Sequence, residues 1–414
     1  MPTKSTEFFN VVPIADALAL LFEHIQPITR TETVPTTDAL DRVLAVAPTS
    51  PLDLPEFVRS TMDGYAVRAA DTFGASATLP AYLDVAAPVH MGQQPTHTLQ
   101  PGQASSIHTG GMLPDGADAV VMIERTQPVD DGEIEILAPV APGENLVQVG
   151  EDVAQSAPIL PAGQRLRPQD IGGLLAVGVL QVEVIEQPTV AIMGSGDEIV
   201  SVEQTPQYGQ IRDINSHVLA ALCQQAGAQV QQLGIAADTY DAIAEKARHG
   251  FQSADLLIIS AGSSVSTRDY TRDAIDALGQ PGVLQHGLAV KPGKPGMVAA
   301  AAGKPIIGLP GNPVSATLVA RQLVLPTLRR LTGEPAAKHQ PTVRATLTSN
   351  IASTTGREDT VPVRLTSDDQ NTQADPIFGK SNLIFTLINA DGFVQVPLNS
   401  NGLKAGSVVD VTLF

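Results

Sequence analysis

The chain has 414 residues, more than one hydrophobic core usually organises, so we expect several domains. Its 25 basic and 43 acidic residues give a formal net charge of −18, which argues against nucleic acid as a partner because the two would repel each other. The single cysteine, Cys223, is expected in the core, and one cysteine excludes an intramolecular disulfide and a cysteine metal cluster. No apolar run reaches the ~18 residues that span a bilayer, so no membrane partner is expected. Both observations indicate a cytoplasmic protein.

The first part of the chain alternates short elements with proline-rich connections. A helix is expected after Pro13, because the apolar residues between Ala15 and Ile25 share one broad face and Pro27 stops it. Prolines crowd the stretch around 42–55, which predicts a connection rather than a helix or central strand. From Tyr82 to Leu137 short apolar runs separated by turns predict a small, mostly β domain.

The second part changes pattern. After a stretch of loops and a short helix at 158–179, strands and helices alternate, with strands expected at 189–193, 230–235, 256–260 and 306–309 and helices at 217–225, 239–249 and 314–331. This alternation predicts a doubly wound α/β domain. The tail at 342–414 returns to period-two alternation and predicts a closing β domain.

The turns after these strands carry the strongest functional signal, because an open parallel sheet binds its ligand beyond the carboxyl ends of its strands. Small residues there let backbone N–H groups approach an oxyanion, and serine hydroxyls add donors. Each such turn alone is more often structural, but together they favour a phosphorylated small molecule as ligand. The turn residues are Gly194, Ser195, Gly196 and Asp197, then Gly262, Ser263, Ser264 and Ser266, and finally Pro310, Gly311, Asn312 and Pro313.

Charged residues complete this predicted site. Asn312 and Pro313 have the sequence of a helix N-cap and a first-turn proline, so the positive end of the following helix should face the same edge. Carboxylates near an anion site are explained if a divalent cation, most naturally Mg²⁺, bridges them to the ligand. Lys291 and Lys294, flanked by prolines, supply the basic groups that an acidic chain needs for an anion.

Taken together, the motifs resemble the molybdopterin molybdenumtransferase family, which includes MoeA and the carboxyl-terminal part of gephyrin. The resemblance covers nearly the whole chain, in a shared order. It is carried by Ser60–Val67, by Thr109–Gly111 with Pro114–Val121, by Gly150–Asp152, by Gly196–Glu198, by Lys291–Pro295 and by Gly308–Ala316.

The resemblance implies a multidomain α/β fold in an elongated homodimer. Its parts would be an extended linker domain, discontinuous over 8–45 and 147–182, and a mostly β domain inserted at 46–146. A doubly wound, MogA-like molybdopterin-binding domain would follow at 183–332, and a C-terminal β domain at 333–414.

The resemblance also implies an activity, the Mg²⁺-dependent insertion of molybdate into adenylylated molybdopterin with release of AMP. Carried over by motif, the catalytic residues would be Asp63, Asp152, Glu198, Asp238 and Asp269, of which Glu198, Asp238 and Asp269 would hold the metal. Thr109, Lys291, Lys294, Pro310 and Pro313 would bind substrate, and Arg357 and Ser381 match ligand-facing positions. Asp63, Thr109 and Asp152 would come from the partner subunit, and a molybdopterin adenylyltransferase and apo-molybdoenzymes would be further partners.

Two departures from the family pattern stand out. The Gly-Gly-Val-Ser-Val-Gly loop of many members is here Gly262–Thr267, one residue shorter before Asp269, and a lysine often found four residues before Lys291 is Gly287. Three other functions stay open: the adenylylation of molybdopterin and a nucleotide pyrophosphatase, which share a similar central domain, and a noncatalytic molybdopterin-binding scaffold, which the altered loop makes more plausible. The adenylylating enzymes usually lack the flanking segments around Asp63 and Asp152, which favours the transferase.

Overall fold

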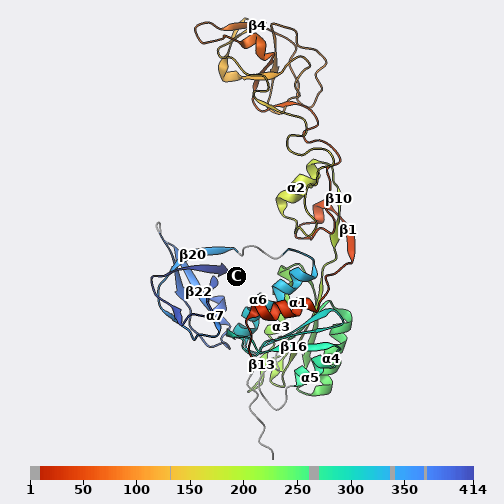
Figure 1. Cartoon of the computed structure of the whole chain (residues 1–414), viewed down its shortest axis with the longest axis vertical. Coiled ribbons are helices and arrows are strands. Elements are labelled where there is room, and N and C mark those ends of the chain that lie inside the picture. The colour runs from red at the N-terminus through yellow and green to blue at the C-terminus, as the bar shows by residue number, and fades with distance from the viewer. Residues whose placement is uncertain (1–9, 131, 261–269, 336–340, 368–370) are drawn as a thin grey trace, which may run out of the picture.

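The structure, a computed structural model, describes residues 10–130, 132–260, 270–335, 341–367 and 371–414. Figure 1 shows an elongated molecule in which a distal lobe, bearing β4 (Ala81–Val85), stands away from the base on a narrow stalk. The base consists of a central domain and a C-terminal barrel that lie side by side. In the described part of the chain, no helix combines the length and apolar character needed to cross a membrane.

The distal lobe is built on one six-stranded sheet in the order β6-β3-β5-β4-β8-β7. Its inward residues, such as Val67, Val121 and Ile134, form one apolar cluster, which matches the period-two pattern of the sequence. The other strands of the sheet are β3 (Gly64–Val67), β5 (Gln103–Ile107), β6 (Ala119–Met122), β7 (Thr126–Asp130) and β8 (Glu133–Ile136), and β2 (Arg59–Ser60) pairs with β9 (Leu146–Val147).

The stalk joins segments that are far apart in the sequence. Strand β1 (Thr31–Pro35) pairs antiparallel with β10 (Gln181–Ile185), and helix α2 (Pro168–Ala176) lies beside them. Helix α2 begins with a proline at its first position, and the Asp170 carboxylate accepts a hydrogen bond from the Arg167 backbone N–H at 2.9 Å, which fixes its start.

The central domain is a six-stranded sheet, in the order β14-β11-β15-β19-β18-β16, covered by helices on both faces. Helices α1, α3 and α6 pack on one face, and α4 and α5 on the other. The strands are β11 (Thr189–Ser195), β14 (Gln229–Ala236), β15 (Leu256–Ser260), β16 (Pro281–His286), β18 (Met297–Ala301) and β19 (Lys304–Leu309). The helices are α1 (Ile14–Glu23), α3 (Asn215–Gln225), α4 (Tyr240–Ser253), α5 (Tyr270–Asp276) and α6 (Pro313–Leu331), and β12 (Ile199–Val200) pairs with β13 (Ile211–Arg212) outside the sheet.

The four strands predicted from the sequence are all present, and they are mutually parallel. Strands β18 and β16 were missed, and they add an antiparallel edge. Strand β18 has the sequence Met-Val-Ala-Ala-Ala and is wholly buried, so it lacks the alternation that identifies a strand and has a single β-branched residue, Val298.

The C-terminal barrel closes because β22 (Glu358–Ser367) pairs with both β23 (Thr372–Pro376) and β24 (Gly392–Val396). Strands β20 (Thr342–Leu347) and β26 (Val408–Leu413) complete the ring, β21 (Ile351–Ala352) pairs with β25 (Gly402–Leu403), and α7 (Phe385–Ile388) is a single turn. One short strand of the central segment, β17 (Val290–Lys291), runs parallel to β22 and so attaches the lysine loop to the barrel.

Cys223 is buried in helix α3, as expected, and burial raises the pKa of its thiol to about 12. Because the thiolate is the reactive form, we predict that the native protein shows no thiol reacting with Ellman's reagent at pH 8. Unfolding in guanidinium chloride should release one thiol per chain. Fast reaction of the native protein would contradict this placement.

Candidate active site

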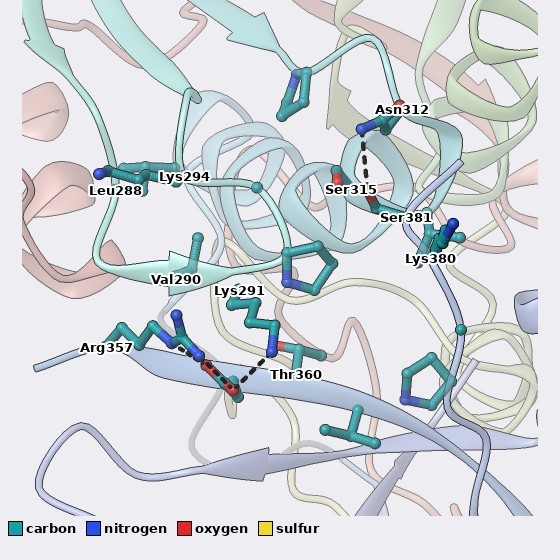
Figure 2. Close-up of a pocket in the computed structure, with 18 of the residues that line it drawn as sticks. Leu288, Val290, Lys291, Lys294, Asn312, Ser315, Arg357, Thr360, Lys380 and Ser381 are labelled. Carbon is teal, nitrogen blue, oxygen red and sulfur yellow. Dashed lines mark hydrogen bonds and ion pairs between the residues drawn. The ribbon is translucent and has the colours of Figure 1, made fainter. Parts of the chain in front are cut away.

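A cavity of about 720 Å³ lies between the central domain and the C-terminal barrel. Its walls are the lysine loop, the start of α6 and two segments of the barrel, around Arg357 and around Ser381 (Figure 2). The cavity brings together six residues predicted from the sequence: Lys291, Lys294, Pro310, Asn312, Arg357 and Ser381. Gly311 and Pro313 belong to the same turn as Pro310 and Asn312.

The electrostatic character of the cavity differs from that of the whole chain. Its lining holds the cationic side chains Lys291, Lys294, Arg357 and Lys380 and one carboxylate, Asp359, although the chain carries a net charge of −18. A locally positive cavity attracts anions that the remaining surface repels. The cavity is therefore suited to an anionic ligand, as the sequence predicted.

The lysine loop is held directly against helix α6. Gly293 has a φ of +114°, and a Cβ atom there would lie 2.1 Å from Cγ2 of Val319 on α6. Only glycine satisfies both conditions, since the conformation is left-handed and the space is already filled. Glycine thus lets the loop pack closely enough to place Lys291 and Lys294 on the cavity wall.

A buried carboxylate organises two of the cations. Asp359 is 4% exposed and accepts a hydrogen bond from Nε of Arg357 at 2.8 Å, while Nζ of Lys291 lies 3.8 Å from its other oxygen. Lys291 and Asp359 are register partners in the β17–β22 pair. Asp359 therefore orients Arg357 through a hydrogen bond and attracts Lys291 electrostatically; the dashed lines in Figure 2 mark these interactions.

The start of α6 forms the opposite wall. Asn312 occupies the N-cap position and Pro313 the first helical position, as predicted, although the Asn312 side chain does not itself cap the helix. Its amide Nδ2 instead donates to Ser381 Oγ at 3.0 Å, and the N–H of Val314 donates to the Ser381 carbonyl at 3.0 Å. The barrel thus takes over a capping role, and Asn312 holds the Ser381 hydroxyl at the positive end of the helix.

The other strand-end turns lie beside this cavity rather than in its lining. Gly194, Ser195, Gly196, Asp197 and Glu198 follow or end β11, and Asp238 follows β14. Since β15 separates β11 from β19, the turn after β11 begins about 10 Å from the Pro310 turn along the sheet edge, and the turn after β14 lies one strand further, at about 14 Å. Of the residues predicted around the third strand, Gly262, Ser263, Ser264, Ser266 and Asp269 lie outside the described residues.

A residue missed by sequence reasoning connects these turns. Nδ2 of Asn215, the first residue of α3, donates to Ser260 Oγ at 3.0 Å and to the Gly311 carbonyl at 2.8 Å. Asn215 therefore ties the end of β15 to the turn after β19. Asp359 and Lys380 were also missed, because nothing in their local sequence separates them from ordinary strand and loop residues.

Only some of the predicted metal ligands lie close to one another. Asp197 and Asp238 are neighbours, since the N–H of Asp238 donates to Asp197 Oδ1 at 3.0 Å, and Glu198 is next to Asp197 in the chain. Within the described ranges, no three histidine, cysteine, aspartate or glutamate side chains lie close enough to hold a metal ion. The oxygen donors present are nevertheless of the type that Mg²⁺ prefers.

The remaining predicted residues lie away from this cavity. Asp63 and Thr109 are next to strands β3 and β5 of the distal lobe, and Asp152 is on the paired connection between lobe and stalk, where its N–H donates to Leu54 O. Figure 1 shows that the lobe stands at the far end of the molecule from the central domain. One chain therefore does not bring these residues to its own cavity.

Asp63 nevertheless has a defined environment. The backbone N–H and the hydroxyl of Thr109 donate to its Oδ1 at 2.7 and 3.1 Å, and these bonds hold the pKa of Asp63 below its ordinary value of 3.8. Because the pKa is lowered in the folded state, the interaction is present above about pH 4 and is lost as the pH falls through the lowered value. Asp63 is thus an exposed, ionised group at neutral pH.

Replacing Thr109 with valine should raise the pKa of Asp63 towards 3.8, because one donor to the carboxylate is removed and the backbone N–H remains. The carboxyl ¹³C chemical shift, followed by NMR against pH, measures this change. Thr126→Val, whose hydroxyl binds Ile123 O in the same lobe, is the control. An unchanged Asp63 midpoint in Thr109→Val would show that the hydroxyl has no part in the shift.

Three family models match successive parts of the chain. The MoeA N-terminal region (domain I and II) matches residues 12–178, the "Probable molybdopterin binding domain" matches 191–330, and the MoeA C-terminal region (domain IV) matches 344–414. A molybdopterin molybdenumtransferase of Haemophilus influenzae is 32% identical over 98% of this chain and 99% of its own length. One of Nostoc sp. is 37% identical over 78% of this chain and 72% of its own.

Solved structures agree with the sequence comparisons. A molybdopterin biosynthesis MoeA protein from Pyrococcus horikoshii OT3 superposes with a TM-score of 0.85 at 30% identity, over 98% of this chain and all of that chain (100%). The predicted fold class, a multidomain α/β protein with a MogA-like central domain and a β-rich C-terminal region, is confirmed. The chain belongs to the MoeA family of molybdopterin molybdenumtransferases, the family that its sequence motifs resemble.

Proposed function

We propose that the protein converts adenylylated molybdopterin and molybdate into molybdenum cofactor and releases AMP. The observation that carries this proposal is the cavity in which the lysine loop, the start of α6 and the Arg357–Asp359 pair meet. Its volume of about 720 Å³ lies in the range of small-molecule sites, roughly 300–1,000 Å³. Relatives described as molybdopterin molybdenumtransferases support the same activity.

The cavity residues fit the charges that this reaction must handle. Cleavage of the phosphoanhydride of the adenylylated pterin develops negative charge on phosphate oxygens, and molybdate is itself a dianion. Lys291, Lys294 and Arg357 would neutralise these oxyanions, with the hydroxyl of Ser381 as a further donor. Since Asp359 holds Arg357 beforehand and attracts Lys291, less reorganisation is needed when the charge develops.

The strand-end turns would bind the nucleotide part of the substrate. Gly194, Ser195 and Gly196 offer small residues and a hydroxyl beyond β11, about 10 Å from the Pro310 turn, a span that suits an extended pterin nucleotide. Asp197, Glu198 and Asp238 would hold Mg²⁺, which when bound supplies positive charge for the phosphates. Asp269 and the serines of 262–266 are proposed for the same site.

A second copy would complete the site. Asp63, Thr109 and Asp152 lie far from the cavity of their own chain, and the distal lobe extends away on a stalk. In a homodimer, the lobe of one protomer could reach the cavity of the other and add an ionised carboxylate to orient the reacting oxygen. The same proposal includes a cytoplasmic location, and a molybdopterin adenylyltransferase and apo-molybdoenzymes as partners.

The test mixes the purified protein with adenylylated molybdopterin, magnesium and molybdate. The expected result is release of AMP together with activation of a cofactor-free molybdoenzyme. Tight pterin binding without AMP release would identify a noncatalytic scaffold and overturn the proposal. Formation of adenylylated molybdopterin from ATP would instead identify an adenylyltransferase.

A further inference from the structure

A second cavity, of about 760 Å³, lies between helices α1, α3 and α6 and the C-terminal barrel. It is separate from the active-site cavity but shares two elements with it. Glu358, the first residue of β22, lines the second cavity, while its chain neighbours Arg357 and Asp359 line the first. One hydrogen bond of 3.3 Å, from Nε2 of Gln322 to Oγ1 of Thr360, joins the two linings.

The second cavity contains a guanidinium that the protein does not fully satisfy. Arg321, on α6, donates from Nη2 to the Leu413 carbonyl at 2.9 Å and lies 5.3 Å from the ring centroid of Phe414. Its Nε is buried and has no hydrogen-bond partner among the described residues. Burial also lowers the pKa of Arg321, because desolvation disfavours its charge. The site thus holds a partly desolvated cation whose hydrogen-bonding capacity the described residues do not fully use.

The carboxylates of the cavity do not neutralise this cation. Asp41, Glu358 and Phe414 with its terminal carboxylate line the cavity, but within the described ranges none of these carboxylates forms an ion pair with Arg321 or with Arg329, two turns further along α6. A third arginine, Arg165, is already bound to Glu334 at 2.6 and 3.0 Å. In a chain with 43 acidic and 25 basic residues, two arginines left without carboxylates in one cavity point to an external anion.

The remaining wall indicates what carries the anion. Leu18, Leu222, Leu325 and Phe393 line the cavity beside the arginines, so its ligand needs an apolar body. We propose that the second cavity binds a small organic anion, whose carboxylate or phosphate group lies on Arg321 while its apolar part packs against these side chains. Arg329, about 12 Å along the helix axis, offers a second charge for a longer ligand.

The alternative explanation is structural, since Arg321 also ties the last strand of the barrel to α6. The two explanations differ in their consequences. A structural arginine changes the stability of the protein when it is replaced, whereas a binding arginine changes the affinity for an anion while the affinity for a neutral analogue is kept.

The test uses a fluorescent probe of matching chemistry, 1-anilinonaphthalene-8-sulfonate, titrated into the full-length protein. Arg321→Gln should weaken probe binding about tenfold or more, because the charge-assisted contact is lost. The matched control is Arg330→Gln, an exposed arginine of the same helix outside the cavity lining, which should bind as the wild type does. The uncharged analogue N-phenyl-1-naphthylamine should bind the wild type and Arg321→Gln equally.

Equal binding of the sulfonate by the wild type and Arg321→Gln would overturn the proposal, as would equal losses in Arg321→Gln and Arg330→Gln. If the near-UV circular dichroism of Arg321→Gln shows that this variant is unfolded, Arg329→Gln is used in its place. The folded Arg329→Gln variant must then weaken binding of the sulfonate, or the proposal fails. Light scattering, which measures the oligomeric state, distinguishes a further outcome. If the probe binds only dissociated monomers, the cavity is covered by a second copy, and the proposal is wrong.

Discussion

Replacing Arg357 with alanine is expected to lower kcat/KM for molybdenum insertion about 100-fold, the usual scale for removing a charged group that stabilises a developing oxyanion. Stability should also fall, by about 2 kcal/mol, because the 4%-exposed carboxylate of Asp359 loses its 2.8 Å hydrogen bond. Steady-state kinetics measure the change in kcat/KM. Denaturant unfolding followed by circular dichroism measures the change in the free energy of unfolding.

The matched control is Arg364→Ala, an arginine of strand β22, which begins one residue after Arg357; among the described residues, Arg364 binds a backbone carbonyl, Asn389 O, at 3.3 Å and no carboxylate. It should keep its activity within about twofold, since it does not line the cavity. Arg357→Lys should recover stability in part but not activity, because an ammonium cannot reproduce the planar geometry of the guanidinium. Full activity in Arg357→Ala would remove this residue from the site.

Replacing Gly293 with alanine is the second large perturbation. The new Cβ would lie 2.1 Å from Cγ2 of Val319 at a φ of +114°, so the lysine loop must move away from α6. A shift of about 1 Å in Lys291 and Lys294 is enough to reduce kcat about 100-fold, because catalysis depends on their positions. The same shift should weaken molybdate binding, which calorimetry can measure.

Two further variants separate backbone strain from steric overlap. Gly406→Ala has a similar left-handed φ, +82°, but nothing within 4 Å of its Cβ, so it reports backbone strain alone and should retain activity. Adding Val319→Ala to Gly293→Ala makes room for the new methyl group and should restore part of the activity. If Gly293→Ala is fully active, the packing of the loop on α6 does not position the lysines.

Much of the fold could be predicted where local pattern and burial agree. Three of the four parallel strands, β11, β15 and β19, contain continuous apolar runs followed in the sequence by turns with glycine, whereas glutamines interrupt β14; each strand was found with small changes at its ends. Strand β18 was missed because its buried alanines resemble a helix more than a strand. Closure of the barrel depends on β22 pairing with both β23 and β24, and no local signal fixes such distant pairings.

The site residues could likewise be predicted where the local sequence is unusual, but not where they meet only through distant pairings. Lys291 and Lys294 could be identified because prolines around them and an acidic chain make them unusual. Their partner Asp359 could not, since it lies 68 positions after Lys291 and meets it only through the parallel β17–β22 pair. Arg357 and Ser381 came from family resemblance alone. The hydrogen bond from Asn312 to Ser381 could not be predicted, because the local N-cap pattern gives no information about the barrel.

The central claim is that each active site combines the cavity of one chain with the distal lobe of another. It is tested most directly by co-expressing two differently tagged copies, one with Asp63→Asn and the other with Lys291→Gln, and purifying the mixed dimer. Each variant alone should be nearly inactive, whereas the mixed dimer regains one intact site and about half of the wild-type AMP release. A mixed dimer as inactive as the two parent variants would show that Asp63 does not act in the cavity of the second chain.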